Sequence, residues 1–177
     1  MEDLSRWPKV ANVAEHVAEH ACFGCGAANP IGLRMEFVSD GKRVGSLVRV
    51  PPTMAGWDRT VHGGILSTIL DEIMGWSVIY LLRKIGVTRS MSVEFLRPVQ
   101  VEQPLTVIGS IIETPSDRQA VVRGEIFVDD DRPCVRATGR FAAMTTQAAV
   151  RLGVMSAEYE ALFQPVLDQP PVGGESV

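Results

Sequence analysis

The longest apolar run of the chain lies between Val61 and Leu82, and its spacing predicts one long helix. Apolar side chains recur along it every three or four residues, as one helix face requires: Ile65, Leu66, Ile69, Leu70, Ile73 and Met74. Thr60 is a possible N-cap, and Gly86 suits the position just past the C-terminal end. A second stripe consists of small residues and one acid: Gly64, Thr68, Asp71 and Gly75. This face can approach another backbone closely while presenting a carboxylate to it.

Shorter segments on both sides of this helix alternate apolar and polar residues, which predicts strands. Before the helix they run from Leu33 to Val38 and from Val44 to Val50, joined by a turn at residues 39–41. Four runs follow the helix: Thr88–Leu96, Leu105–Thr114, Gln119–Val128 and Cys134–Thr145. Their connections are short, so neighbouring strands are expected to be antiparallel. The sequence therefore predicts an α+β fold in which about six strands wrap around one central helix.

The two ends of the chain are expected to lie outside this domain. Short helices are predicted at Val10–His20 and at Ser156–Phe163, the second with Ser156 as its N-cap. Residues 168–177 are expected to be disordered. The expected organisation is an N-terminal segment at 1–21, one domain at 22–146 and a C-terminal segment at 147–177.

Composition narrows the class of protein. The chain has 177 residues, of which 46% are hydrophobic and 21% charged, as in an ordinary globular domain. Its net charge of −4, with no basic run, argues against nucleic acid as a partner. Adjacent Asp71 and Glu72 would be costly in a bilayer, so no membrane partner is expected. Three cysteines without an apolar signal segment indicate a reducing, cytoplasmic location.

Motifs at a fixed distance resemble those of a known enzyme family. His62-Gly-Gly is followed by Asp71 nine residues on, and then by a strand that ends in Phe95-Leu-Arg-Pro98. This pattern is similar to that of the hotdog-fold acyl-CoA thioesterases, in the PaaI-like group of the 4-hydroxybenzoyl-CoA thioesterase superfamily. The segment CFGCGAANPIGL, which begins at Cys22, recurs in one branch of that group. The resemblance covers residues 22–145.

The resemblance implies that acyl-CoA is the substrate, that free acid and CoA are the products, and that no cofactor is needed. It also implies homodimers or homotetramers, with active sites at a subunit interface. Matched position by position, Asp71 is the catalytic acid, Gly63 and Gly64 polarise the thioester carbonyl through their amides, and Thr88 is an assisting hydroxyl. Several members carry an amide side chain shortly before His-Gly-Gly. This chain has none there, and Asp58 is a candidate substitute.

The same residues suit thioester hydrolysis on chemical grounds. A helix N-terminus offers N–H groups to a developing oxyanion, although the two glycines there can also serve only to make a sharp turn. Asp71 can act as general base or as nucleophile, and its alternative role is that of a hydrogen-bonded structural acid. Glu72 is expected to be a salt-bridging neighbour. His62 either contacts substrate or fixes its loop, and Thr88 either positions water or Asp71 or is an ordinary strand residue.

A possible metal-binding pattern precedes the domain. His16 and His20 share a face if this segment is helical, and Cys22 and Cys25 form a Cys-x2-Cys pair, so zinc is an alternative to consider. The spacing is shorter than in zinc fingers, and the family's Cys-x2-Cys occurs without a need for metal. We therefore expect no metal, and the zinc alternative stays open. Cys134 has no evident base and is not expected to be a nucleophile.

Two other functions remain open at this stage. A non-catalytic acyl-CoA-binding hotdog protein would keep the pocket and lose the acid, whereas Asp71 is present. A hotdog hydratase or dehydratase fits the His-Gly-Gly pattern poorly. Neither the acyl chain nor the carrier, CoA or acyl carrier protein, follows from the sequence. Four arginines are candidates for phosphate contacts, and none can be assigned: Arg89, Arg97, Arg118 and Arg123.

Overall fold

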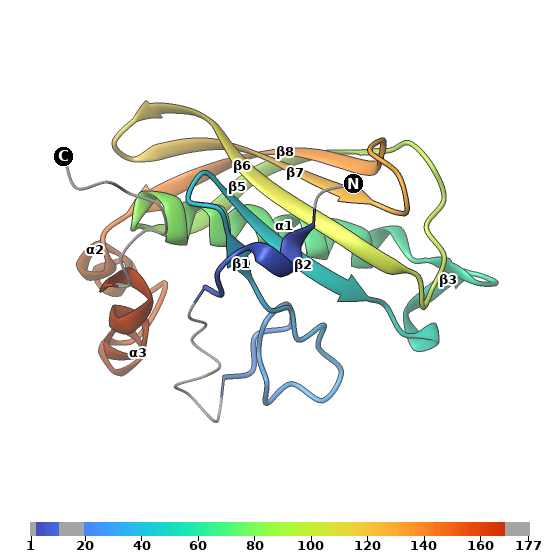
Figure 1. Cartoon of the computed structure of the whole chain (residues 1–177). Helices are drawn as coiled ribbons and strands as arrows, with labels where there is room; N and C mark the ends of the chain where they lie inside the picture. The colour runs from blue at the N-terminus through green and yellow to red at the C-terminus, as the bar shows by residue number, and fades with distance from the viewer. Residues whose placement is uncertain (1–2, 11–19, 169–177) are drawn as a thin grey trace.

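One antiparallel sheet packs around one long helix in this protein (Figure 1). The structure, a computed structural model, describes residues 3–10 and 20–168. The sheet has six strands in the order β1-β2-β6-β7-β8-β5, and helix α1 packs against β2, β5, β6, β7 and β8. The strands are β1 (Val38–Ser39), β2 (Arg43–Arg49), β5 (Ile85–Phe95), β6 (Pro104–Ser116), β7 (Gln119–Phe127) and β8 (Pro133–Met144), and α1 is Gly63–Leu82. The predicted α+β architecture is confirmed.

Helix α1 forms the centre of the hydrophobic core. Its buried side chains are Leu66, Ile69, Leu70, Ile73, Met74, Trp76, Ser77, Val78 and Tyr80. They occupy most of the helix circumference because strands cover it on several sides. The helix is long and apolar enough to cross a membrane, yet half of that stretch is buried inside the fold. Its apolar character is thus explained by enclosure within the sheet.

The helix ends at Leu82, where the predicted run ends, but the residues predicted to flank it at both ends are wrong because they pair in strands. Thr60 lies in the short strand β4 (Thr60–Val61), which pairs with β3 (Ala55–Trp57), so His62 is the N-cap instead. At the other end Arg83 adopts the left-handed conformation, with φ 55°, and ends the helix. Gly86 therefore lies within β5 rather than at the helix end.

The predicted first strand is also largely replaced by another structure. Only Val38–Ser39 joins the sheet as β1. The preceding residues bond to the neighbouring loop: the Leu33 amide donates to Phe23 O at 2.8 Å, and the Met35 amide donates to Gly24 O at 2.9 Å. The predicted alternation of apolar and polar residues is still visible in this segment: Met35 and Phe37 are buried, and Arg34 and Glu36 between them are exposed. An extended segment with one apolar face thus ties this loop to the core.

Helices α2 (Thr146–Arg151) and α3 (Ala157–Asp168) lie beside the C-terminal end of α1 (Figure 1). The predicted Ser156 cap is present, since the Tyr159 amide donates to Ser156 Oγ at 3.1 Å. Helix α2 was not predicted, and neither was the β3–β4 hairpin. Two short 3-10 helices, Leu4–Arg6 and Pro52–Met54, complete the elements of the described residues. Most of the predicted Val10–His20 helix, and residues 169–177 of the tail, lie outside the described residues.

A close approach between α1 and β6 generates a test of this packing. A Cβ atom at Gly109 would lie 2.3 Å from Ser77 Oγ and 2.8 Å from the main-chain oxygen of Ile73. We expect Gly109→Ala to lower the free energy of unfolding by about 1–3 kcal/mol, because the helix backbone cannot move aside. Urea denaturation measures this loss.

Gly124→Ala is the matched control. Its Cβ would meet side-chain atoms of Leu70 and Met74 at 3.0 and 3.1 Å, and such atoms can shift. We expect a smaller loss of stability for this variant. Equal losses for the two variants would contradict the close backbone approach.

Candidate active site

The start of α1 holds three of the residues predicted for the site. His62 caps the helix through its side chain: Nδ1 accepts a hydrogen bond from the Gly64 amide at 3.0 Å. The Gly64 N–H is therefore already used. Within residues 3–10 and 20–168, by contrast, the Gly63 amide has no hydrogen-bond partner. A helix N-terminus carries partial positive charge, so this amide is a donor suited to an oxyanion.

Asp71 and Thr88 come from different elements and meet. Asp71 lies two turns into α1, and Thr88 lies on β5, where the pairing with β8 shifts register between Thr88 and Ser90. A bulge of this kind turns a side chain out of its regular direction. The Thr88 hydroxyl donates to Asp71 Oδ1 at 2.6 Å, the short distance expected for a charge-assisted hydrogen bond. The pair fixes one carboxylate oxygen and leaves the other for chemistry.

A cavity of about 380 Å³ lies beside this pair. Its walls come from the loop at residues 20–25, from α1, from the start of β5, from β8 and from the C-terminal residues 154–163. The polar side chains in these walls are His20, Cys22, Cys25, Asp71, Glu72, Thr88 and Tyr159. The apolar remainder of the wall suits an acyl group, and Asp71 is the acid that joins Thr88 at the edge of the cavity.

Glu72 points into the same cavity but has a different environment. The Trp76 indole Nε1 donates to its Oε1 at 3.1 Å, and Cys22 Sγ lies 3.8 Å from both carboxylate oxygens. Burial, and secondarily the nearby Cys22 sulfur, raise the pKa of Glu72 to about 7. The expectation that Glu72 forms a salt bridge is wrong, because an indole and a thiol take that place. Sequence reasoning missed this residue, and its adjacency to Asp71 was the available signal.

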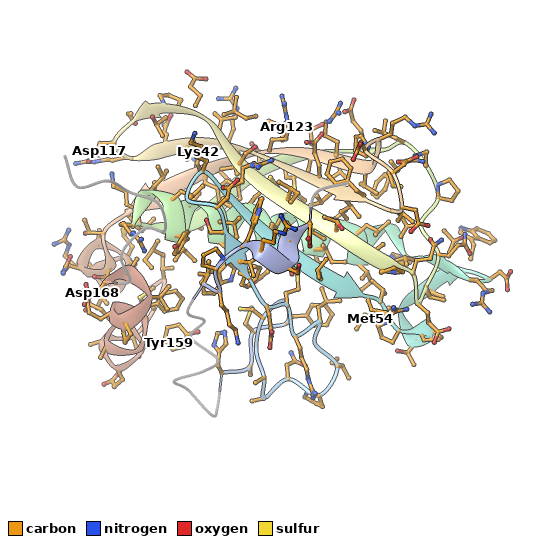
Figure 2. The ribbon with its side chains drawn as sticks, in the orientation of Figure 1. Lys42, Met54, Asp117, Arg123, Tyr159 and Asp168 are labelled. Atoms are coloured by element: carbon orange, nitrogen blue, oxygen red, sulfur yellow. The ribbon has the colours of Figure 1, made fainter. Side chains whose placement is uncertain are left out.

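The two cysteines near the N-terminal end are brought together with a histidine. His20 Nε2 lies 3.4 Å from Cys25 Sγ, and His20 Nδ1 lies 2.5 Å from the Tyr159 hydroxyl, which reaches across from α3 (Figure 2). The hydrogen bond with Cys25 lowers the pKa of Cys22 to about 5, and the same bond, together with burial, raises the pKa of Cys25. His16 lies outside the described residues.

The other residues that the sequence analysis considered for the site lie in different parts of the structure. Arg89 and Arg118 line a second cavity of about 650 Å³, together with Lys84 and Arg151. Arg97 instead pairs with Asp130 at 2.7 Å, and Arg123 is an exposed residue of β7. Asp58 is exposed at the β3–β4 turn, with φ 46°. Cys134 is buried in β8.

Comparisons with known proteins agree with this architecture. Residues 59–135 match the family model described as Thioesterase superfamily. A solved thioesterase superfamily protein is similar with a TM-score of 0.62 and 27% identity, covering 70% of this chain and 60% of that one. The present chain thus spans less than two thirds of that relative's length.

Two further solved structures have the same fold. A hypothetical thioesterase from Streptococcus pneumoniae TIGR4, solved with coenzyme A, has a TM-score of 0.55 and 25% identity over 59% of this chain and 82% of that one. The E. coli PaaI protein from the phenylacetic acid degradation operon has a TM-score of 0.57 and 18% identity over 63% and 80%. No curated protein matches the sequence. The predicted hotdog fold and the resemblance to PaaI-like thioesterases are confirmed.

The cap at the start of α1 yields a prediction. His62→Ala removes the acceptor of the Gly64 amide, so we expect the free energy of unfolding to fall by about 1 kcal/mol. His62→Asn supplies another acceptor at the N-cap and should keep most of that stability. Urea denaturation of both variants checks this. A loss as large in the Asn variant as in the Ala variant would show that His62 stabilises the protein through other contacts.

Proposed function

We propose that this chain, a hotdog-fold protein of the thioesterase superfamily, hydrolyses acyl-CoA thioesters to a free acid and CoA. The observation that carries the proposal is the Asp71–Thr88 hydrogen bond at 2.6 Å in the wall of an apolar cavity. Both residues lie inside the region that matches the family. A similar thioesterase has been solved with coenzyme A, which supports CoA as the carrier.

Asp71 supplies the reactive carboxylate in this proposal. As a general base it takes a proton from water, and the resulting hydroxide attacks the thioester carbonyl carbon. As a nucleophile it attacks that carbon itself, and water then hydrolyses the anhydride. In both routes the C–S bond breaks and the CoA sulfur leaves as a thiolate that takes up a proton. Thr88 holds Asp71 in place in either case.

The carbonyl oxygen is bound by the Gly63 amide at the start of a helix. The developing negative charge is stabilised there by a fixed N–H group and by the helix dipole. Gly63 and Asp71 are eight residues apart in one helix, which separates them by about 12 Å along the axis. That distance is too long for both to act on one thioester. We therefore assign the Gly63 amide and Asp71 of each active site to two different subunits.

The edge of the sheet supports this pairing of subunits. Strand β5 is the last strand of the six, so its outer side has no partner strand within the described chain. An edge of eleven residues without protection is open to pairing with a second copy. Phe95 at the end of β5 is 55% exposed and lies against Gly63. Joining two β5 edges would cover this ring and bring Thr88 to the interface.

The second cavity suits the other end of the substrate. Arg89 follows Thr88 on β5 and lines that cavity with Arg118. Guanidinium groups bind phosphate through paired hydrogen bonds, so these two arginines are our candidates for contacts with the CoA phosphates.

The first prediction concerns the acid and its hydroxyl partner. We expect Asp71→Asn to lower kcat by at least about 100-fold, because an amide is neither base nor nucleophile. Thr88→Val keeps the side-chain shape but removes the donor to Asp71. It should lower kcat by about tenfold or more, whereas Thr88→Ser should keep most activity. A thiol-release assay over aliphatic and aromatic acyl-CoAs measures these rates. Full activity of Asp71→Asn would refute the assignment.

The second prediction tests the division of labour between subunits. Gly63→Pro removes the N–H at a helix position that tolerates proline. We expect this variant and Asp71→Asn each to be inactive alone. Co-expressed at equal levels, they should recover about a quarter of wild-type activity, because half of the dimers are mixed and each mixed dimer keeps one intact site.

The doubly substituted chain is the control for that experiment and should stay inactive. If both groups acted from one subunit, no mixed dimer would contain an intact site and co-expression would restore nothing. Size-exclusion chromatography with light scattering verifies that every preparation is an oligomer.

A further inference from the structure

We propose that this protein binds a zinc ion through His20, Cys22, Cys25 and Glu72. The ring nitrogen of His20 and the two cysteine sulfurs all lie within 4.8 Å of one another. His20 and Cys25 are 6% and 5% exposed. These atoms come from a loop outside the region that matches the thioesterase family, and the proposal does not depend on the hydrolase activity.

The distances fit tetrahedral coordination. Zinc bonds of about 2.0–2.3 Å to nitrogen and sulfur place neighbouring ligand atoms about 3.5 Å apart. His20 Nε2 and Cys25 Sγ are separated by 3.4 Å. Both carboxylate oxygens of Glu72 lie 3.8 Å from Cys22 Sγ, although Glu72 is outside the group of three ligand atoms that lie within 4.8 Å of one another. Glu72 is our candidate for the fourth ligand, and a turn of its side chain toward His20 would complete the site. Two thiolates, one imidazole and one carboxylate form a donor set that suits zinc.

Hydrogen bonds from residues outside the cluster orient two of the proposed ligands, His20 and Glu72. The Tyr159 hydroxyl lies 2.5 Å from His20 Nδ1, and a proton on Nδ1 leaves Nε2 as the metal-facing nitrogen. The Trp76 indole N–H donates to Glu72 Oε1 at 3.1 Å. Metal-binding histidines and carboxylates are usually held by a second hydrogen bond of this kind. In this protein Tyr159 belongs to α3 and Trp76 belongs to α1.

Two glycines let the loop close around the cluster. A Cβ at Gly26 would lie 2.4 Å from the Cys22 main-chain nitrogen and 2.5 Å from His20 O. The Gly26 amide donates to Cys22 O at 2.9 Å, which folds the Cys-x2-Cys segment into a tight turn. A Cβ at Gly24 would lie 2.2 Å from Glu72 Oε2. The loop therefore has no side chain where its backbone and the carboxylate must come close.

The ion would join three separate parts of the fold. His20, Cys22 and Cys25 belong to the N-terminal loop, Glu72 belongs to α1, and Tyr159 connects α3 to the histidine. Zinc binding would displace the Cys25 proton, and the divalent cation would offset the repulsion between the two thiolates and the carboxylate. Binding energy at such a site contributes directly to folding. Zinc here would stabilise the wall of the cavity that also contains Asp71.

Metal analysis of the full chain, expressed with zinc and purified under reducing conditions without chelators, tests the proposal. We expect about one zinc per chain. Cys22→Ala and Cys25→Ala should each reduce the zinc content at least about tenfold, since loss of a ligand weakens a closed site strongly. Cys134→Ala is the matched control, because Cys134 is buried in β8 and outside the cluster, and it should keep its zinc. Asp71→Asn should keep it as well.

If the cysteine variants do not fold, measurements on the wild-type chain still test the proposal. Replacement of zinc by cobalt in the wild-type chain should produce a thiolate-to-cobalt charge-transfer band, and a strong chelator should lower the melting temperature. A wild-type chain that, fully reduced, binds neither zinc nor cobalt would overturn the proposal. Equal zinc content in the Cys22→Ala and wild-type proteins would do the same. So would a Cys22–Cys25 disulfide that persists in the purified protein, detected by counting free thiols.

Discussion

Enclosure of an apolar helix by a single sheet constrains every polar group on that helix. A buried polar atom is costly unless a partner lies within reach, so the few polar side chains of α1 must be matched. Ser77 donates to Ile73 O at 2.8 Å, Asp71 accepts from Thr88, and Glu72 accepts from Trp76. The three partners differ in kind. Ser77 bonds to its own helix and serves packing, Asp71 belongs to the proposed catalytic pair, and Glu72 belongs to the proposed metal site.

Adjacent acids on the helix show how strongly the surroundings decide a role. Asp71 and Glu72 differ in direction by about 100° around the axis. The first accepts a hydrogen bond from the Thr88 hydroxyl of the edge strand β5. The second meets an indole and a cysteine-containing loop, and its pKa is raised by burial. One carboxylate is thus kept available and the other is held within the fold, although the sequence places them side by side.

Periodicity was sufficient to predict the sheet, the central helix and the residues that line its buried face. Each is specified by local repetition of apolar residues, and the bounds of β2, β5, β6, β7 and β8 differ by only a few residues from those predicted. Periodicity failed where contacts distant in sequence decide the structure. Thr60 joins a hairpin instead of capping the helix, and the extended segment before Val38 bonds to a loop instead of the sheet. Residues 20 and 159 meet across 139 positions, which no local pattern encodes.

The far wall of the cavity comes from Val154, Met155, Tyr159 and Phe163, all beyond residue 135, where the family match ends. The proposed catalytic pair lies inside the matched region, whereas these four residues of the cavity wall lie outside it. Under the proposed function, changes in the C-terminal stretch would alter part of the acyl-binding wall without altering Asp71. Paralogues with an identical Asp–Thr pair but divergent C-termini would then act on different metabolites.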